Sequence, residues 1–394
     1  MIHEADVIVV GAGPSGSTAA KLLADRGYRV ALLDRAAFPR HKTCASWINR
    51  LAFVRFPYLN SRLQELVECP FYGVTFYDPF LKREGRYLER RPAGYLSLRS
   101  KFDDGLRRIA VEAGAEFHGG CAVVRVEQDG REARARTAAG DEFHGRILIG
   151  ADGASSRVAM SAGLRHGWGR RDYVICANAD IPFQPAGIQE FYGQRFPFRV
   201  YLQYHTLPGY GWVFPKRHHI CVGIGGLLAD NRAIRPLFRE FFNELQEREQ
   251  IPPNLRLEDT HFDIDPAGAV HQLKALTRGR VLLIGDAAGF VSGCTGEGIY
   301  PGMVSAQVAG TVIHRALSGN SVEAELAQFD QAWRLDLASY VKRLPGGAEE
   351  KKTQGRLDLI FRLAFVARMA GRVFLYGETP SFKTAARSLL PDLA

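Results

Sequence analysis

The sequence predicts an α/β protein with a Rossmann-like parallel sheet, a second domain of antiparallel or mixed sheet, and a C-terminal helical tail. Three observations predict this fold class. Residues 6–35 follow the order strand, glycine turn, helix, strand; residues 146–159 and 279–310 each carry an apolar strand into a glycine-rich turn and a helix; and residues 209–226 alternate aromatic with small residues. A chain of 394 residues is long enough for two such domains.

The first predicted strand, residues 7–10, is apolar and β-branched throughout, which suits a strand buried on both faces. Gly11, Gly13 and Gly16 follow it in the pattern G-x-G-x-x-G. The first glycine permits a tight turn, the second lets the backbone approach a pyrophosphate, and the third lets the helix pack closely on the strand. The start of that helix offers N–H groups and the positive end of its dipole to phosphates.

The second predicted strand, residues 30–33, ends in Asp34. This carboxylate follows the glycine motif at roughly the 20-residue spacing that places an acidic side chain on a ribose hydroxyl. Strand, glycines, helix, strand and terminal acid occur in order, so the segment is predicted to bind a dinucleotide.

Two later motifs extend this prediction. The stretch RILIGADGASSRVA, residues 146–159, is a strand that ends near Asp152 and Gly153, and residues 279–310 place Gly285 and Asp286 after another strand. An aspartate at a strand end can accept hydrogen bonds from ribitol hydroxyls. The glycines that follow, and a helix beginning near Glu297, are suited to approach a flavin ring.

In order and spacing, the three motifs resemble the FAD-containing aromatic hydroxylase fold (p-hydroxybenzoate hydroxylase-like). This superfamily includes monooxygenases, flavin-dependent halogenases and geranylgeranyl reductases. The resemblance implies FAD as cofactor, with Arg99 near its pyrophosphate and Asp152 and Asp286 in the second and third FAD motifs. The full set of cofactor-binding residues that it implies is Gly11, Gly13, Pro14, Ser15, Gly16, Asp34, Arg35, Lys42, Cys44, Ala45, Arg99, Val124, Asp152, Gly153, Gly285, Asp286, Gly296, Gly298 and Ile299.

The stretch YGWVFPKRHHICVGIG, residues 210–225, resembles the substrate-binding motif of geranylgeranyl reductases, Y-x-W-x-F-P followed after seven residues by G-x-G. The W-x-W-x-I-P motif of tryptophan halogenases is incomplete here. In HKTCASW, Cys44 stands where those reductases carry a cysteine beside the isoalloxazine, and it is the candidate catalytic residue. The implied substrate-binding residues are Trp47, Tyr210, Trp212, Phe214, Pro215 and Cys294.

The residues alone leave a plainer interpretation open. Alternating Tyr210, Trp212 and Phe214 are also what any half-buried strand shows. The run Lys216 to His219 is interpreted as a solvated hairpin turn without a role. Ala45 and Trp47 stand where family members commonly have a glycine and a small or acidic residue, which predicts a reshaped substrate cavity.

Three hypotheses about activity remain open. The first is reduction of carbon–carbon double bonds on an apolar, isoprenoid-type substrate. The second is a flavin-dependent monooxygenase that hydroxylates an aromatic ring, free or held on a carrier or protein. The third is a flavin-dependent halogenase or a flavin-bearing maturation factor. The electron donor is expected to be external, either NAD(P)H or a reductase or ferredoxin, because a second G-x-G-x-x-G motif is missing from the sequence.

Composition bounds the remaining functions. The net charge of +9 is compatible with acidic partners or an anionic membrane, but no nucleic-acid-binding motif accompanies it. The six cysteines form no C-x-x-C pair, so no metal site is predicted. The sequence has neither a signal-peptide pattern nor an 18-residue apolar run, which predicts a cytoplasmic protein with possible peripheral membrane contact. An apolar, arginine-striped helix at residues 356–377 is expected to pack across the FAD-binding domain with its arginines reaching solvent, and docking to a membrane surface or a partner is the alternative.

The predicted domains are interleaved along the chain. The FAD-binding domain is expected at residues 1–72, 99–170 and 272–340. The substrate domain is expected at 73–98 and 171–271, and the C-terminal helical segment at 341–394.

Overall fold

A computed structural model describes residues 1–168, 174–227, 234–257, 263–267, 273–293, 295–341 and 358–378. The chain divides into two compact units, each built from three stretches. Unit 1 consists of Met1–Lys42, Arg99–Tyr173 and Ala267–Lys342, and unit 2 of Thr43–Leu98, Val174–Pro266 and Arg343–Ala394. The division differs from the predicted one at residues 43–72, because strands in this stretch pair within unit 2.

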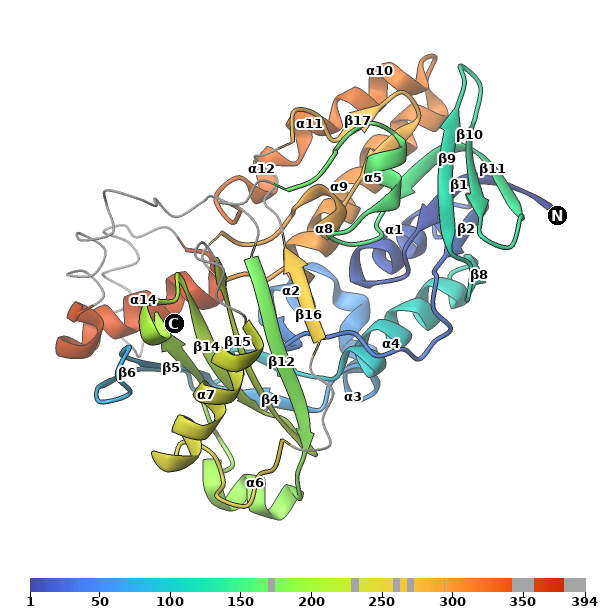
Figure 1. Ribbon diagram of the computed structural model, residues 1–394. Helices are drawn as coiled ribbons and strands as arrows, with labels where there is room; N and C mark the ends of the chain where they lie inside the picture. The colour runs from blue at the N-terminus through green and yellow to red at the C-terminus, as the bar shows by residue number, and fades with distance from the viewer. Residues whose placement is uncertain are drawn as a thin grey trace. The chain divides into compact units, whose positions relative to one another are not determined.

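Unit 1 contains the predicted parallel sheet, in the order β18-β11-β1-β2-β8. Figure 1 labels β11, β1, β2 and β8 of this sheet. Pairing joins Val10 to Gly150 and to Leu33, and Gly150 to Leu283. The strand ends that precede the three glycine motifs therefore lie together at the carboxyl end of the parallel sheet, where ligands of such folds bind. The strands of unit 1 are β1 (Ile2–Val10), β2 (Val30–Leu33), β8 (Glu116–His118), β9 (Val123–Gln128), β10 (Ala133–Thr137), β11 (Glu142–Gly150), β17 (Thr277–Arg278) and β18 (Val281–Leu283).

Helices follow these strands, as the sequence predicted. Helix α1 begins at Pro14, within the first glycine motif, and packs against both α4 and α9. The helices of unit 1 are α1 (Pro14–Ala24), α4 (Arg99–Glu112), α5 (Arg157–Ser161), α8 (Gly285–Ala288), α9 (Ile299–Ser318), α10 (Val322–Ala327), α11 (Phe329–Ala332) and α12 (Arg334–Leu337).

Unit 2 contains a seven-stranded mixed sheet in the order β16-β12-β15-β14-β13-β5-β6, and a three-stranded sheet in the order β3-β7-β4. The strands are β3 (Trp47–Asn49), β4 (Cys69–Phe71), β5 (Gly73–Tyr77), β6 (Glu84–Leu88), β7 (Gly94–Leu96), β12 (Val174–Pro182), β13 (Phe198–Leu202), β14 (Gly209–Pro215), β15 (His219–Leu227) and β16 (Asp263–Ala267). Its helices include α2 (Arg50–Arg55), α3 (Leu63–Leu66), α6 (Pro185–Tyr192), α7 (Ile234–Glu247) and α14 (Ala364–Tyr376), with 3-10 turns η1 (Pro57–Arg62) and η2 (Tyr204–Thr206).

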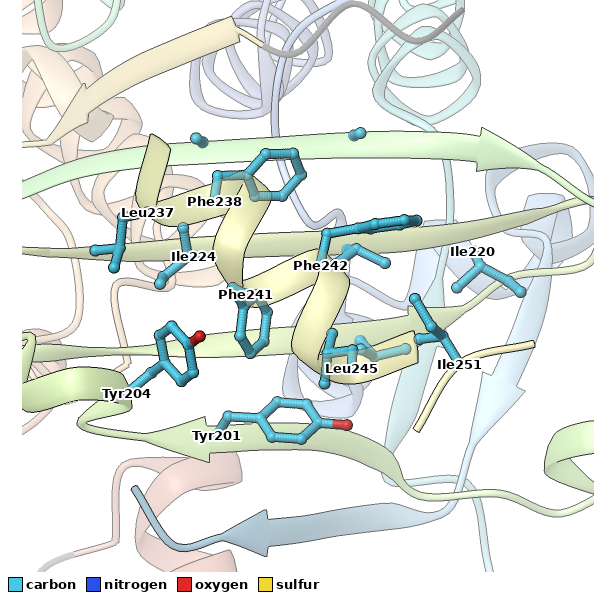
Figure 2. Packing of buried hydrophobic residues seen from close by; sticks show 14 of the residues in the cluster. Tyr201, Tyr204, Ile220, Ile224, Leu237, Phe238, Phe241, Phe242, Leu245 and Ile251 are labelled. Atoms are coloured by element: carbon cyan, nitrogen blue, oxygen red, sulfur yellow. The ribbon is translucent and has the colours of Figure 1, made fainter. Parts of the chain in front are cut away.

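Helix α7 covers one face of the large sheet of unit 2. Figure 2 shows Phe238, Phe241 and Phe242 of this helix directed onto the strands, where they join a buried cluster with Ile224 and Tyr201. Successive strand residues point to opposite faces of a sheet. On β14, Val213 belongs to the cluster under α7, whereas Trp212 and Phe214 belong to a second buried cluster on the other face. That cluster includes residues of α14.

The predicted single helix at residues 356–377 is interrupted in the structure. Residues 358–362 are helical, Leu363 is extended with φ −127° and ψ 112°, and α14 then runs to Tyr376. The apolar pattern continues across Leu363, so periodicity could not reveal the break. Among the helices that the structure describes, none combines the length and apolar character needed to cross a bilayer.

Candidate functional site

The first glycine motif shapes the turn between β1 and α1. Gly11 has φ +105°, and a Cβ there would lie 2.3 Å from the Ala151 carbonyl oxygen; a Cβ on Gly16 would lie 1.8 Å from the Gly11 oxygen. A side chain at either position would therefore collide with the backbone of the turn. Gly13 differs, because the nearest atoms to a Cβ there are Nη2 of Arg40 at 3.6 Å and Nη2 of Arg99 at 4.0 Å. The second glycine thus opens the backbone toward two guanidinium groups.

A buried carboxylate orients these two guanidiniums. Asp103, which is fully buried, accepts hydrogen bonds from Nε and Nη2 of Arg99 at 2.7 and 2.8 Å. The same carboxylate lies 3.0 Å from Nη2 of Arg40. The paired geometry fixes the plane of the Arg99 group. Two cations beside a bare backbone turn and a helix N-terminus form a suitable cradle for a pyrophosphate.

Asp34 stands at the end of β2, as the sequence predicted. Its Oδ2 accepts a hydrogen bond from the Ala12 amide at 2.8 Å, and its Oδ1 accepts one from the Ala36 amide at 2.9 Å. The carboxylate is nearly buried and fixed by the glycine turn itself. Each oxygen retains a further lone pair with which it can accept from a ribose hydroxyl.

The aspartate of the second motif accepts hydrogen bonds from the residues that follow it in the chain. Asp152 accepts hydrogen bonds from the Ser156 hydroxyl and from the amides of Arg157 and Val158, at 2.7 Å and 3.1 Å respectively. Burial raises the pKa of this carboxyl, although these hydrogen bonds oppose the shift. Gly153, with φ +81°, has no atom within 4 Å of the position of a Cβ. The motif thus holds α5 in place and leaves a bare backbone at the carboxyl edge of the sheet.

The third motif lies against the first. Cβ atoms built on Gly285 and on Gly302 of α9 would come within 2.3 and 2.4 Å of the Ser15 hydroxyl, so both glycines make room for α1. A Cβ on Gly298 would lie 2.7 Å from Oδ1 of Asp286. Gly298 also caps α9, whose buried first residue is Ile299. The third motif thereby presents a second helix N-terminus beside an aspartate.

Three further predicted cofactor residues are less enclosed. Arg35 is exposed, Lys42 is partly buried, and the Val124 side chain on β9 is 53% exposed. Gly296 has φ +68° and open space around the position of a Cβ. Pro14 occupies the first turn of α1, where its missing N–H costs nothing.

The sequence patterns did not predict two arginines of this site, Arg40 and Arg165. Arg40 lies in a loop without a motif, and only the fold brings it to Gly13. Arg165, which is 5% exposed, donates to the carbonyl oxygens of Ala287 at 3.1 Å and Ala154 at 2.7 Å. It therefore ties the turn after the second motif to α8, and no local sequence signal marks it.

The residues of unit 1 fit FAD by structural criteria. A glycine turn that faces two arginines can receive two phosphates, the fixed Asp34 carboxylate can receive ribose hydroxyls, and bare glycines at the third motif leave backbone accessible.

Cys44 and Ala45, in unit 2, precede β3 in a strained turn. Ser46 has φ +56°, which is unusual for a residue with a side chain, and its amide donates to the Cys44 sulfur at 3.3 Å. The Ser46 hydroxyl donates to the Cys44 carbonyl oxygen at 3.2 Å. The turn therefore fixes a partly exposed thiol on a defined backbone.

The aromatic residues predicted to bind substrate gather in one buried cluster of unit 2. Trp47 stacks on Phe374 of α14 with ring centroids 5.6 Å apart, and Tyr210 meets the same ring edge-on at 5.6 Å. Trp212 and Phe214 are 5% and 2% exposed, and Pro215 is also buried. The chain itself covers this face with α14.

The glycines of β15 make room for the Trp212 indole. A Cβ on Gly223 would lie 2.2 Å from Cζ2 of Trp212, and one on Gly225 would lie 2.5 Å from the Cys176 sulfur. Gly223 therefore makes room for the Trp212 ring of the neighbouring strand, and Gly225 makes room for Cys176 and, at 3.4 Å, for Cζ3 of Trp212. Cys294, the remaining predicted substrate residue, lies outside the described residues.

The interpretation of Lys216 as part of a solvated turn is wrong. Its side chain is fully buried and its Nζ lies 2.5 Å from Oδ1 of Asp180. Burial, the largest single influence, would lower the pKa of Lys216, but several opposing interactions, led by the charge and hydrogen bond of Asp180, together outweigh it and the net pKa is raised. Two further thiols lie in the same unit: the partly buried Cys69 donates to the Pro215 carbonyl oxygen at 3.6 Å, and the fully buried Cys221 follows on β15.

Comparison with known families gives two matches. The model described as FAD binding domain matches residues 66–342, which is more than half of the chain. The model described as FAD dependent oxidoreductase matches residues 6–109.

Curated relatives are similar over most of their length. A digeranylgeranylglycerophospholipid reductase 2 of Methanosphaera stadtmanae is 30% identical over 332 residues, covering 80% of this chain and 79% of the relative. A menaquinone reductase of Mycobacterium tuberculosis is 30% identical over 333 residues, covering 78% of this chain and 76% of the relative.

Two solved structures show the same fold. A geranylgeranyl bacteriochlorophyll reductase-like protein from Thermoplasma acidophilum has a TM-score of 0.74 at 20% identity, covering 99% of this chain and 96% of its own. The flavin-dependent halogenase CmlS has a TM-score of 0.73 at 16% identity, covering 98% of this chain and 76% of its own.

Proposed function

Since the chain belongs to the FAD-binding-domain family, we propose that it reduces carbon–carbon double bonds in the isoprenoid part of a lipid. The chain is an FAD-dependent oxidoreductase. The isoprenoid substrate is the part of this proposal that goes beyond the family membership.

One observation carries this substrate class. The relatives matched over about four-fifths of this chain are named as reductases of a digeranylgeranylglycerophospholipid and of menaquinone. The two names denote lipids with different head groups, and what these lipids share is an isoprenoid chain. A shared reductive reaction on that chain accounts for both names, whereas hydroxylation or halogenation of a ring accounts for neither.

The cofactor is assigned to the three motifs of unit 1. We assign the pyrophosphate to the Gly13 turn with Arg40 and Arg99, and the ribose to Asp34. The Asp286 carboxylate and the start of α9 are assigned to the ribitol and pyrimidine side. When bound and reduced, FAD supplies a hydride equivalent to one carbon of the double bond.

The other carbon requires a proton, and Cys44 is proposed to hold it. A thiol is a suitable donor because it loses a proton without leaving a strongly basic group behind. The amide of Ser46, at 3.3 Å from the sulfur, would hold the thiol in a fixed position. Solvent would then return the proton to the partly exposed thiol.

The proposed partners follow from the reaction. Electrons are assigned to an external donor, either NAD(P)H or a reductase or ferredoxin. A lipid substrate would bring the protein to a membrane surface, and the net charge of +9 would favour an anionic one.

The decisive experiment is an anaerobic incubation of the chemically reduced flavoprotein with a geranylgeranyl lipid, followed by mass spectrometry. Reduction predicts a gain of two hydrogens per double bond without O2, and in D2O deuterium at both carbons of each reduced bond, because the hydrogen carried by a chemically reduced flavin also comes from solvent. Incorporation of oxygen that occurs only in air would overturn the proposal in favour of a monooxygenase. A Cys44→Ser variant tests the proton donor: hydrogen gain should slow by roughly tenfold or more while FAD content stays unchanged.

A further inference from the structure

Two histidines and a glutamate converge in unit 1 away from the glycine motifs. His3 lies near the start of β1, and Glu116 and His118 lie on β8. Their ligand atoms all lie within 4.8 Å of one another. We propose that His3, Glu116 and His118 form a binding site for a divalent transition-metal ion of the zinc type.

One aromatic ring orients both imidazoles. The Phe143 ring stacks on His3 with centroids 4.5 Å apart and an interplanar angle of 10°. The same ring meets His118 at 4.8 Å and 73°, and the two imidazoles lie 5.2 Å apart at 68°. Phe143 is buried, so it provides a fixed floor for both rings. Two rotationally restrained imidazoles lose little entropy on binding an ion.

The contact between His118 and Glu116 has the geometry of two ligands. Nε2 of His118 lies 3.1 Å from Oε1 of Glu116, yet it is buried and makes no hydrogen bond of acceptable geometry. Two ligands of one tetrahedral zinc ion, each about 2.0–2.1 Å from the metal, lie roughly 3.3 Å apart and point at the ion rather than at each other. Glu116 is 74% exposed and can adjust to complete the set.

The ligand set selects the class of ion. Imidazole nitrogens with a carboxylate suit Zn²⁺, Co²⁺ or Ni²⁺, whereas Mg²⁺ and Ca²⁺ prefer oxygen ligands. Three protein ligands leave a fourth position for water. An ion here would join the first residues of β1 to β8, which β2 otherwise separates in the sheet.

The test uses the full-length flavoprotein with no polyhistidine tag and a native N-terminus, because His3 lies two residues from it. Titration with Co²⁺ should give visible absorption bands of a low-symmetry site at about one equivalent, and Zn²⁺ should displace them. Melting temperature should rise with Zn²⁺ concentration, since an ion that binds the folded state stabilises it by mass action.

Variants separate the site from adventitious binding. His118→Ala and His3→Phe, which retains the stack on Phe143, should each weaken Co²⁺ binding by roughly tenfold or more, and Glu116→Gln should weaken it less. His314→Ala, on α9 outside the cluster, is the matched control and should bind as the wild type does. Unchanged FAD absorbance and circular dichroism would show that the variants fold. Absence of a Co²⁺ spectrum in the wild type, or an equal one in His118→Ala, would overturn the proposal.

Discussion

Asp103 holds Arg99 through two hydrogen bonds of 2.7 and 2.8 Å, from Nε and from Nη2, in a pair that is almost completely buried. The family resemblance indicates Arg99, but the Asp103 carboxylate fixes the orientation of its guanidinium group. The same carboxylate faces Arg40 at 3.0 Å. The affinity of the site for a pyrophosphate is therefore expected to depend on a residue that would not itself contact the cofactor.

Replacement of Asp103 by asparagine tests this dependence. The change keeps the shape but leaves two guanidiniums without their carboxylate, so the free energy of unfolding should fall by about 3 kcal/mol. The FAD dissociation constant should rise by roughly tenfold, because the Arg99 group loses its fixed orientation. Urea unfolding and flavin fluorescence titration measure the two effects. Asp104→Asn, on the same helix with partly exposed partners, is the control and should change stability by less than about 1 kcal/mol.

Alanine at Gly13 and at Gly16 should give different phenotypes. At Gly16 the new Cβ would collide with backbone 1.8 Å away, so the protein should lose folded yield. At Gly13 the Cβ has only the ends of two flexible side chains within 4 Å and the backbone has φ −72°, so the protein should fold. That methyl group would still occupy space assigned to the pyrophosphate, and FAD affinity should fall by roughly tenfold or more. Equal FAD binding by Gly13→Ala and wild type would contradict the assignment.

The cysteines should differ in reactivity toward iodoacetamide. Burial raises the pKa of Cys69 to about 12 and raises the pKa of Cys221 well above its usual value. The thiolate is the reactive form, so a raised pKa lowers the reactive fraction at any pH below it. Both should resist alkylation at pH 8, and the rate at Cys69 should climb between pH 7 and 10 without a plateau. Peptide mapping checks this, with urea-unfolded protein as the control; a plateau near pH 9 would contradict burial.

The stability of the protein should depend on Lys216 and Asp180 being present together, because the two charges are buried as a pair. Asp180→Asn leaves a buried ammonium without a carboxylate and should lower the free energy of unfolding by about 3 kcal/mol at pH 8. The double variant Lys216→Met with Asp180→Leu should be less destabilised than this single variant. The raised pKa of Lys216 means that its contribution is complete below pH 10.5 and is lost as the pH rises through the folded-state value. Urea titrations at pH 8 and above pH 10.5 would test the sign.

The sequence predicted the parts of this protein that local patterns determine. The strand, glycine turn and helix around Gly11, and the strand ends before Asp152 and Asp286, lie where the motifs indicated, and Gly11 and Gly16 are each required by a nearby backbone atom. The predicted fold class and FAD-dependent oxidoreductase activity are confirmed. The roles of individual site residues remain predictions.

The remaining features depend on long-range contacts. Arg40 reaches Gly13 only through the fold, and Lys216 looked solvated because it stands in a basic run, while its partner Asp180 lies on another strand. Alternation correctly placed Trp212 on one face of a strand but could not say what covers that face. The break at Leu363 escaped notice because an apolar helix and an apolar extended residue look alike in sequence.

Phe374 has an evolutionary consequence. Its ring stacks on Trp47 and meets Tyr210, yet it comes after residue 342, where the match to the FAD-binding family ends. One wall of the aromatic cluster is therefore encoded by a segment after the family match, apart from the motifs assigned to the cofactor. Substitutions in this segment would alter that wall without changing the glycine turns. Diversification of this wall and retention of the redox machinery are genetically separable in this chain.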